Sequence, residues 1–479
     1  MAEASTSREK IQKAGDFHAD EIEFITSTGL SIDLLGNVLH ITFFEDIQSG
    51  AITGNCIIND VVNLAVIGPV IGQEYIRLKL RSNGLKEQEG VIDFTEHMLL
   101  VNSLQLKEQG ANGNQFLILE FSTSELQKDQ RIRINQSYSG TFSEIFKRIM
   151  RSQLNSKKKL YVEPTRGNKK IVFPNFSPFE AINYMKRNSV SAHDGSPTYM
   201  FFEDFKGYHF RSLSTMYSEP TSFTYTTSVP GSSVNDPFID MGTVIDYNTH
   251  GVGDSLAAQR LGSYGSELIT YDTYTRRFKT TTYNYLDNFD DETHITAGRD
   301  KTIDEFPLIS STPVQDRSRL SDFSARRYLV PHANFVDDDG NYTDLTVVFD
   351  EKGKPVYHSP QTETWLQKRQ SQLLQLERGI TCTIKTNGNT LLDCGDIVEF
   401  NLPSNTSAKT EKQERYDFFY RGRFLIKSIR HDFDFSKRKH ESLMSLVKDS
   451  LPSEILPSAE SLETEPENNG EIIEDFYDA

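Results

Sequence analysis

Residues 55–80 have the sequence NCIINDVVNLAVIGPVIGQEYIRLKL. This stretch predicts two strands, at 56–58 and 75–80, with a tight turn at Asn59-Asp60, an apolar span to Val66 and a break at Gly68-Pro69 between them. Apolar and charged side chains alternate along the second strand, in the order Ile76, Arg77, Leu78, Lys79 and Leu80. This period of two is typical of a strand that has one buried face.

A second stretch repeats the way in which this strand begins. Residues 394–402, CGDIVEFNL, place a glycine and an acid before a strand, as the sequence around Gly72 does. Two copies of one strand start favour two related β-barrels in a single chain.

The hydrophobic period changes after the first run of strands. Short strands at roughly ten-residue spacing, up to about residue 130, are typical of an all-β barrel or sandwich. Capping boxes at Thr141-Phe-Ser-Glu144 and Ser177-Pro-Phe-Glu180 then predict two helices. The strands TYMFFEDF and YHFRSL, joined at Lys206-Gly207, end this block near residue 220. We expect a small α+β domain here.

The second half of the chain carries weaker signals. Residues 221–238 are rich in Ser, Thr, Pro and Gly, which favours a linker. Beyond it we expect a helix at 254–261 with Asp254 as its cap, two strands within 267–285, an acidic loop-rich stretch at 286–355, a helix at 361–376 that carries Trp365, a hairpin of 380–384 with 391–402 across Asn387-Gly388, and pairing of 423–435 with 441–448.

Taken in order, these motifs resemble the baseplate hub subunit of contractile-tailed bacteriophages, a family related to the hub part of type VI secretion spike proteins. The segments that carry the resemblance are GAITGNCIINDVVNLAVIGPVIGQEYIRLKL, LILEFSTSELQKDQRIRI, YSGTFSEIFKRIM, NFSPFEAINYMKRNSV, GDIVEFNLP and GRFLIKSIRHDFDF with HESLMSLVKDSL. These segments lie within residues 25–220 and 375–450. Their order along the chain identifies the family more specifically than any single segment does.

The resemblance implies a fold that is mainly β with an α+β insertion: two tube-type β-barrels plus a small α+β domain and a loop-rich insertion. The expected ranges are a flexible N-terminal arm at 1–18, the first barrel at 19–130, the α+β domain at 131–220, a linker at 221–238, the second barrel at 239–450 with an insertion at about 286–378, and an acidic disordered tail at 451–479.

The resemblance also implies partners and a location. Family members are homotrimers that link the six-fold tail tube to the three-fold central spike. We therefore expect a structural virion protein in the tail baseplate, assembled in the host cytoplasm, with the spike and tube proteins as partners. Tape measure and baseplate wedge proteins are further partners that such a position allows.

Charge and composition limit the function classes. The net charge is −17 and the pI about 5.2, which argues against binding nucleic acid by phosphate neutralisation. An acidic wall would instead let duplex DNA pass without specific binding. The 479 residues exceed what one core usually serves. Residues 451–479 hold nine acidic side chains and no Lys or Arg, a composition that favours disorder or folding on a partner.

The cysteines and the N-terminus point to a reducing compartment. Cys56, Cys382 and Cys394 are too few for a disulfide scaffold. Cys382 and Cys394 could face each other across a turn, although two reduced strand cysteines are the preferred interpretation. The N-terminal sequence has no apolar signal region, and no apolar run is long enough for a membrane-spanning segment.

No motif for catalysis, a cofactor or a metal is present, so we expect no catalytic, cofactor-binding or metal-ligating residues and no enzyme activity. The sequence DDDGN at 337–341 invites a calcium-loop interpretation. With Gly340 at the sixth loop position, Phe335 and Thr346 would fill the first and twelfth, and neither has a carboxylate. The lysines at 157–159 predict a solvated turn, and His40 a structural strand histidine.

Two other functions remain open at this point. The first is the hub of a type VI-like contractile secretion spike. The second is a cell-wall-degrading tail enzyme, because the abundant carboxylate pairs of an acidic chain do not exclude a glycosidase dyad.

Overall fold

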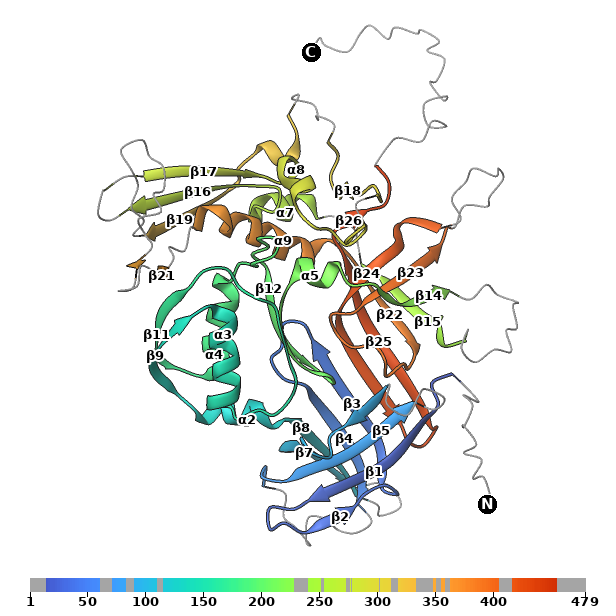
Figure 1. Ribbon diagram of the computed structural model, residues 1–479. Helices are drawn as coiled ribbons and strands as arrows, with labels where there is room; N and C mark the ends of the chain where they lie inside the picture. Colours follow the sequence, from blue (N-terminus) through green and yellow to red (C-terminus); the bar gives the residue numbers. More distant parts are fainter. Residues whose placement is uncertain are drawn as a thin grey trace, which may run out of the picture.

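The computed structural model describes residues 14–60, 71–82, 90–109, 115–227, 240–250, 254–272, 276, 278–300, 302–311, 318–332, 348–349, 355–357, 362–404 and 416–454. The fold is mainly β, with an α+β domain and a further unit attached to two barrel-like halves (Figure 1). The fold class predicted from the sequence is confirmed.

The second half of the chain forms a closed six-stranded barrel. Its strands are β14 (Thr221–Thr227), β15 (Thr243–Thr249), β22 (Ile380–Asn387), β23 (Ile397–Pro403), β24 (Tyr416–Asp434) and β25 (Lys439–Lys448). They follow the order β24-β23-β14-β15-β22-β25, and pairing of β24 with β25 closes the ring. Alternating side chains of these strands fill one hydrophobic core, which includes Tyr225, Ile384 and Phe400.

The first half repeats the same strand order. Its strands are β1 (Phe17–Ile25), β3 (Val38–Asp46), β4 (Thr53–Asp60), β5 (Tyr75–Ser82), β7 (Leu99–Gln109) and β8 (Gln115–Thr123), with β2 (Ser31–Asp33) and β6 (Val91–Asp93) at its margins. The path β5-β7-β8-β4-β3 matches β23-β24-β25-β22-β15, and every neighbouring pair within both paths is antiparallel. The sixth strand differs in direction, because β1 is antiparallel to β5 whereas β14 is parallel to β23.

The two strand starts correspond in detail. Gly72 and Gly395 both have positive φ, 83° and 89°, which a glycine adopts without strain. The carbonyl oxygen of Glu74 accepts a hydrogen bond from the Val101 N–H at 2.9 Å, and that of Asp396 accepts one from Ile426 at the same distance. A bulge follows at the same place on β7 and β24. The repeated start predicted from the sequence is therefore present in both halves.

Strand β24 joins the two halves into one sheet. It has 19 residues, and its far end, from Ser428 to Asp434, pairs with β3. Phe433 lies in the core of the first half. No pairing joins β1 to β3 among the described residues, and the tip of the β24–β25 hairpin lies there instead. The Gly15 carbonyl accepts a hydrogen bond from the His440 N–H of β25 at 2.7 Å, and the Phe17 ring contacts the Phe433 ring.

The α+β domain is held by its own core. Its elements are α2 (Ser124–Arg131), β9 (Ile134–Gly140), α3 (Phe142–Arg148), the π-helical turn η1 (Ile149–Gln153), β10 (Leu160–Val162), β11 (Lys169–Phe176), α4 (Pro178–Asn188), β12 (Tyr199–Asp204), β13 (Gly207–Ser212) and α5 (Leu213–Tyr217). Both predicted capping boxes are present, at Thr141 and Ser177. Apolar residues of α3 and α4 pack on β12 and β13.

A further unit, here called the outer unit, projects away from the barrels beyond the α+β domain (Figure 1). It contains α7 (Ser255–Leu261), β16 (Gly265–Asp272), β17 (Phe278–Asn284), α8 (Tyr285–Asn288), η2 (Phe289–Asp291), η3 (Leu320–Asp322), β19 (Arg326–His332), η5 (Thr362–Thr364) and α9 (Leu366–Arg378). Short strands β18 (Phe306–Pro307) and β26 (Ser450–Leu451) pair with each other, as do β20 (Val348–Phe349) and β21 (Pro355–Tyr357).

The outer unit corrects the expected start of the insertion. The strands expected at 267–285 are present as β16 and β17, but they pair with β19 in a separate sheet and add nothing to the barrel. The helix at 255–261 has the predicted Asp254 cap. The helix around Trp365 begins at Leu366, because Trp365 is its N-cap residue, and the expected start at 359–361 lies outside the described residues.

Two other predictions about the barrels are wrong. Residues 221–227 of the expected linker form β14, where Tyr225 is fully buried, because threonine-rich sequence suits strands as well as loops. The hairpin of 380–384 with 391–402 does not form, since β22 pairs with β15 and β25 and β23 pairs with β14 and β24. The Gly388 N–H donates to the His440 carbonyl and so extends the contact with β25. The pairing predicted between 423–435 and 441–448 is confirmed.

Smaller differences concern the ends of segments. Asn59-Asp60, expected to be a turn, ends β4. β1 begins at Phe17, inside the expected arm, and Leu451, expected in the tail, is buried in β26. The calcium-like sequence at 337–341, residues 1–13 of the arm and residues 455–479 of the tail lie outside the described residues.

Candidate functional site: a polar junction between the barrels

The β12–β13 hairpin lies where three hydrophobic cores meet. Three aromatic side chains on or beside β12 each pack into a different core. Phe201 lies in the core of the α+β domain, Phe202 lies in the core of the second barrel, and Phe205 packs at the edge of the core of the first half. Phe205 contacts Phe43 at 5.5 Å between ring centroids. The hairpin therefore fixes the positions of all three units relative to one another.

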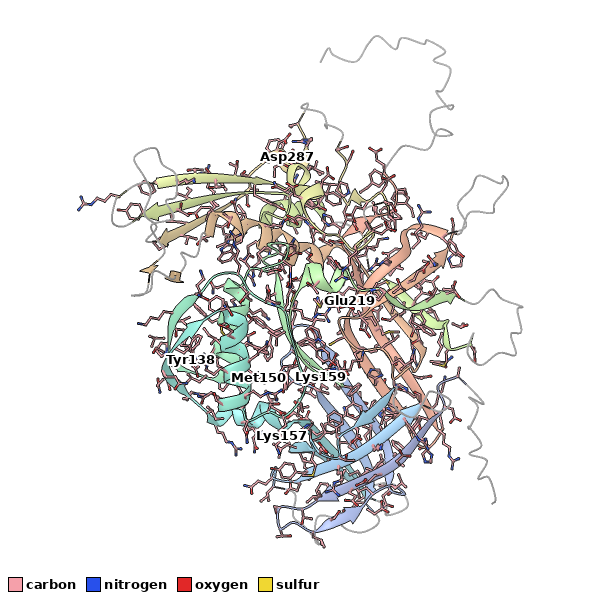
Figure 2. The ribbon with its side chains drawn as sticks, in the orientation of Figure 1. Tyr138, Met150, Lys157, Lys159, Glu219 and Asp287 are labelled. Carbon is pink, nitrogen blue, oxygen red and sulfur yellow. The ribbon has the colours of Figure 1, made fainter. Side chains whose placement is uncertain are left out.

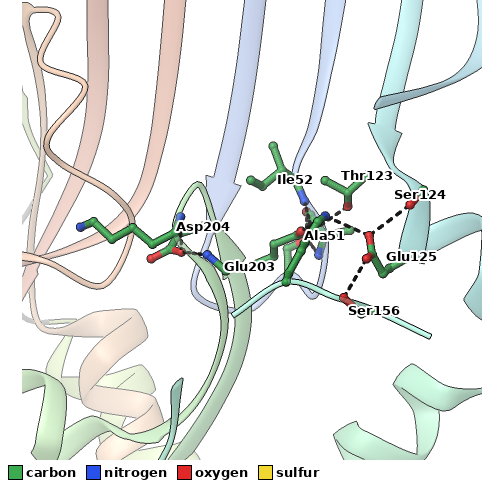
Figure 3. A network of polar contacts seen from close by, with 12 residues as sticks. Ala51, Ile52, Thr123, Ser124, Glu125, Ser156, Glu203 and Asp204 are labelled. Atoms are coloured by element: carbon green, nitrogen blue, oxygen red, sulfur yellow. Dashed lines mark hydrogen bonds and ion pairs between the residues drawn. The ribbon is translucent and has the colours of Figure 1, made fainter. Parts of the chain in front are cut away.

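Buried charges accompany these aromatic contacts on one side of the hairpin. The Lys158 ammonium donates to Glu125 of α2 at 2.9 Å and to Glu203 of β12. Glu203 also accepts from the Ile52 N–H at 3.2 Å and from the Thr123 hydroxyl at 2.6 Å. Figure 3 labels the partners Glu203, Glu125, Ile52 and Thr123 in this group of contacts. The group is called the Lys158 network below.

The electrostatics of the Lys158 network favour one protonation state. Burial alone would lower the pKa of Lys158, but Glu203 and Glu125 outweigh burial and raise it. Burial would raise the pKa of Glu125, whereas its contacts with Lys158 and Ser156 bring it below the ordinary value. Burial raises the pKa of Glu203 above its ordinary value, because it outweighs the opposing effect of Lys158. A charged lysine between the two carboxyl groups is thus the stable arrangement.

Lys158 contradicts the solvated turn expected for the lysines at 157–159. Lys157 and Lys159 are exposed and labelled in Figure 2, whereas only 8% of the Lys158 side chain is exposed. Lys159 lies over the Tyr161 ring at 4.6 Å. No pattern in the sequence distinguishes the central lysine, because its carboxylate partners are 33 and 45 residues away.

A second buried group lies on the other side of the hairpin. Glu45 of β3, Asp204 of β12 and Asp393, which precedes β23, are all less than one-tenth exposed. Lys206 contacts Asp393 at 2.6 Å, and Asp204 contacts His209 at 2.8 Å. Glu45 of the first half and Asp393 of the second half therefore lie close to Asp204. Lys206 is the lysine that contacts this group of three carboxyl groups.

Crowding of these acids changes how they titrate. Burial, then Asp393 and Asp204, raise the pKa of Glu45 well above its ordinary value of 4.5. Burial and Asp204 likewise raise the pKa of Asp393, against the opposing effect of Lys206. One oxygen of Glu45, Oε1, has no hydrogen-bond partner among the residues that the structure describes. Burial and mutual repulsion therefore raise the pKa of both carboxyl groups in the folded protein.

This arrangement predicts that stability falls as the pH rises. A carboxyl whose pKa is raised on folding contributes stability below its unfolded pKa and loses that stability as the pH passes through the folded pKa. We expect Glu45→Gln, which keeps an acceptor for the Cys394 N–H, to reduce this loss by about 1.4 kcal/mol for each unit of raised pKa. Urea unfolding from about pH 5 to about pH 9 measures the effect.

Glu96→Gln is the matched control for Glu45→Gln, because Glu96 is exposed. The control should show the wild-type pH dependence. Equal pH dependence of Glu45→Gln and the wild type would contradict the raised pKa of Glu45.

Among the described residues, no group of three or more His, Cys, Asp or Glu side chains is arranged to hold a metal ion. All three cysteines are free and buried, and burial raises the pKa of the Cys56 thiol to about 12. His40 is half-buried on β3, 4.0 Å from Asp432 of β24. None of the described helices is long and apolar enough to span a bilayer.

Comparisons with known proteins give structural neighbours only. No family model and no curated protein sequence matches the chain. Solved structures do match. A tail protein from Neisseria meningitidis MC58 has 11% identity and a TM-score of 0.48, over 91% of this chain and 97% of its own. The 43 kDa tail protein of prophage MuSo2 from Shewanella oneidensis has 10% identity and a TM-score of 0.48, over 90% and 98%.

A third neighbour comes from a secretion system. It is a type VI secretion component of E. coli with structural similarity to tail proteins of bacteriophage T4, with 9% identity and a TM-score of 0.38 over 88% of this chain and 76% of its own. Structures of a Francisella PdpA-VgrG complex also match. The neighbours are phage tail and type VI spike-related proteins, the two kinds that the sequence motifs resemble.

Proposed function

We propose that this chain is a structural protein of a contractile phage tail, the homotrimeric baseplate hub that links the six-fold tail tube to the three-fold central spike. The repetition of one barrel unit within the chain carries the proposal. Two equivalent units per chain make six positions in a trimer, so that a six-fold tube can rest on a three-fold spike. The polar junction would keep the two units of each chain at a fixed spacing.

The proposal includes a passage for the genome. The net charge of −17 favours a lumen that repels phosphate and lets duplex DNA pass without specific binding. The spike and tube proteins would be the direct partners, and the tape measure and wedge proteins would lie next to them. The protein would then be a virion component with no catalytic role, assembled in the host cytoplasm.

Oligomeric mass tests the hub directly. Sedimentation of the purified protein at low micromolar concentration should give three times the chain mass of 54.6 kDa. A stable monomer would contradict the proposal. Duplex DNA added to the same sample should not bind, and tight binding that weakens with salt would contradict the lumen assignment.

The alternatives have separate tests. Gene neighbours that encode tail sheath, tube and capsid proteins would support a phage, whereas neighbours of a secretion cluster would support a type VI-like hub. Zymography on peptidoglycan tests the cell-wall enzyme, and we expect no cleared band.

Chelation should leave the melting temperature of the protein unchanged, since the sequence contains no set of metal ligands with the required spacing.

A further inference from the structure

The sheet of the outer unit has one covered face and one open face. On the covered face Leu268 is fully buried, and Gln367 of α9 donates to the Ser266 carbonyl at 3.0 Å. Successive side chains of a strand point to opposite faces, so Ile269 and Tyr271 lie on the other face. In Figure 1 this sheet extends away from the barrels, and α9 lies along one side of it.

Strand register gathers apolar side chains on the open face. Ile269 is directly opposite Leu329 of β19, and Tyr271 is opposite both Phe278 of β17 and Pro331 of β19. The Tyr271 and Phe278 rings are 4.7 Å apart between centroids. Phe278 is 69% exposed and Leu329 68% exposed. These five residues are called the outer patch, and contiguous exposed apolar residues of this kind mark interaction sites.

The outer patch has a basic margin in an acidic protein. Arg327 lies on the open face opposite Glu267, and Arg276 lies between β16 and β17. Lys279 and Arg326 pair with Thr270 and Ser266, which belong to the covered face. Arg327 pairs with Glu267, yet 74% of its side chain is exposed. The chain as a whole has a net charge of −17, so this margin is opposite in sign to the rest of the molecule. Its natural occupant is a segment that is both apolar and acidic.

One segment of the chain itself has that composition. Residues 471–479, EIIEDFYDA, combine four acidic side chains with Ile472, Ile473, Phe476 and Tyr477, and contain no Lys or Arg. They lie outside the described residues, which end at Glu454. The 17 residues from Glu454 to Glu471 can reach about 55 Å when extended.

We propose that residues 471–479, from the same or a neighbouring chain, bind the outer patch. The apolar side chains of the segment would cover Phe278 and Leu329, and its carboxylates would face the arginines of the margin. Burial of apolar area supplies most of the binding free energy, and the charges select an acidic occupant. The inference does not depend on the hub function, because it uses only the outer unit and the composition of the segment.

Photo-crosslinking in the full-length protein tests the inference. Benzoylphenylalanine in place of Tyr477 should crosslink mainly to residues 265–284 and 326–332, as mapped by mass spectrometry. Leu329→Ser should lower the yield at these sites at least about tenfold, because a buried leucine is worth more than one factor of ten in affinity. Leu256→Ser is the matched control, since Leu256 is 79% exposed in α7 of the same unit but outside the outer patch.

The outcomes separate the possible occupants. Crosslinks at the outer patch that Leu329→Ser abolishes and Leu256→Ser preserves would support the proposal, and mixing with isotope-labelled protein would tell whether the segment comes from the same chain. Crosslinks elsewhere, or an equal effect of both substitutions, would overturn it and leave the outer patch for a different partner. Circular dichroism of both variants checks folding, and sedimentation of the same samples tests the trimer separately.

Discussion

Lys158→Met should lower the free energy of unfolding by about 3–5 kcal/mol, the usual cost of removing one partner from a buried ion pair. Methionine keeps most of the lysine's volume, so the loss is electrostatic and not a cavity effect. Glu125 and Glu203, 2% and 1% exposed, would then face each other without a cation. Chemical denaturation at neutral pH measures the loss.

Two further variants make the Lys158 experiment specific. Lys157→Met removes an exposed neighbouring charge and should stay within about 0.5 kcal/mol of the wild type. Adding Glu203→Gln to Lys158→Met should restore part of the stability, because one of the two buried charges is then removed. A Lys158→Met variant as stable as Lys157→Met would show that the network contributes little.

Phe433→Ala should destabilise the first half of the molecule more than the second, although Phe433 belongs to a strand of the second barrel. The residue is fully buried in the first-half core, where it contacts Phe17 at 5.1 Å and Phe43 at 6.1 Å between ring centroids. Truncation of a buried phenylalanine typically costs about 3–5 kcal/mol. Hydrogen exchange should accelerate in β1, β3 and β4 before it does in β14 and β22.

Phe435→Ala serves as the control for Phe433→Ala. Phe435 contacts the same Phe17 ring but is only partly buried, so its truncation should cost less. Uniform acceleration of exchange over both halves in Phe433→Ala would contradict a local role and would indicate that β24 makes the two halves one cooperative unit.

Local features of this protein could be predicted because their causes are local. The capping boxes at Thr141 and Ser177 need only residues three positions apart, and both are present. Buried and partly exposed side chains alternate along β5, because successive side chains of a strand point to opposite faces and only one face of β5 is buried. The glycine and acid before β5 and β23 revealed the repeated barrel unit, because positive φ leaves few alternatives to glycine at such a start.

The candidate site depended on contacts that the sequence does not encode locally. Lys158 looks like its two exposed neighbours until the fold brings Glu125 and Glu203 to it. Glu45 and Asp393 are 348 positions apart in the chain, and their shared burial at the hairpin is a product of packing.

The pairing of strands was likewise decided by the tertiary structure. Two barrel-like units and two capped helices could be predicted, because the repeated strand start and the capping boxes each act over a few residues. Only the fold placed β14 between β23 and β15, removed the expected hairpin at Asn387-Gly388 and made β24 common to both halves. Strand order depends on which distant edges can bury their side chains together, and composition alone carries no information about that choice.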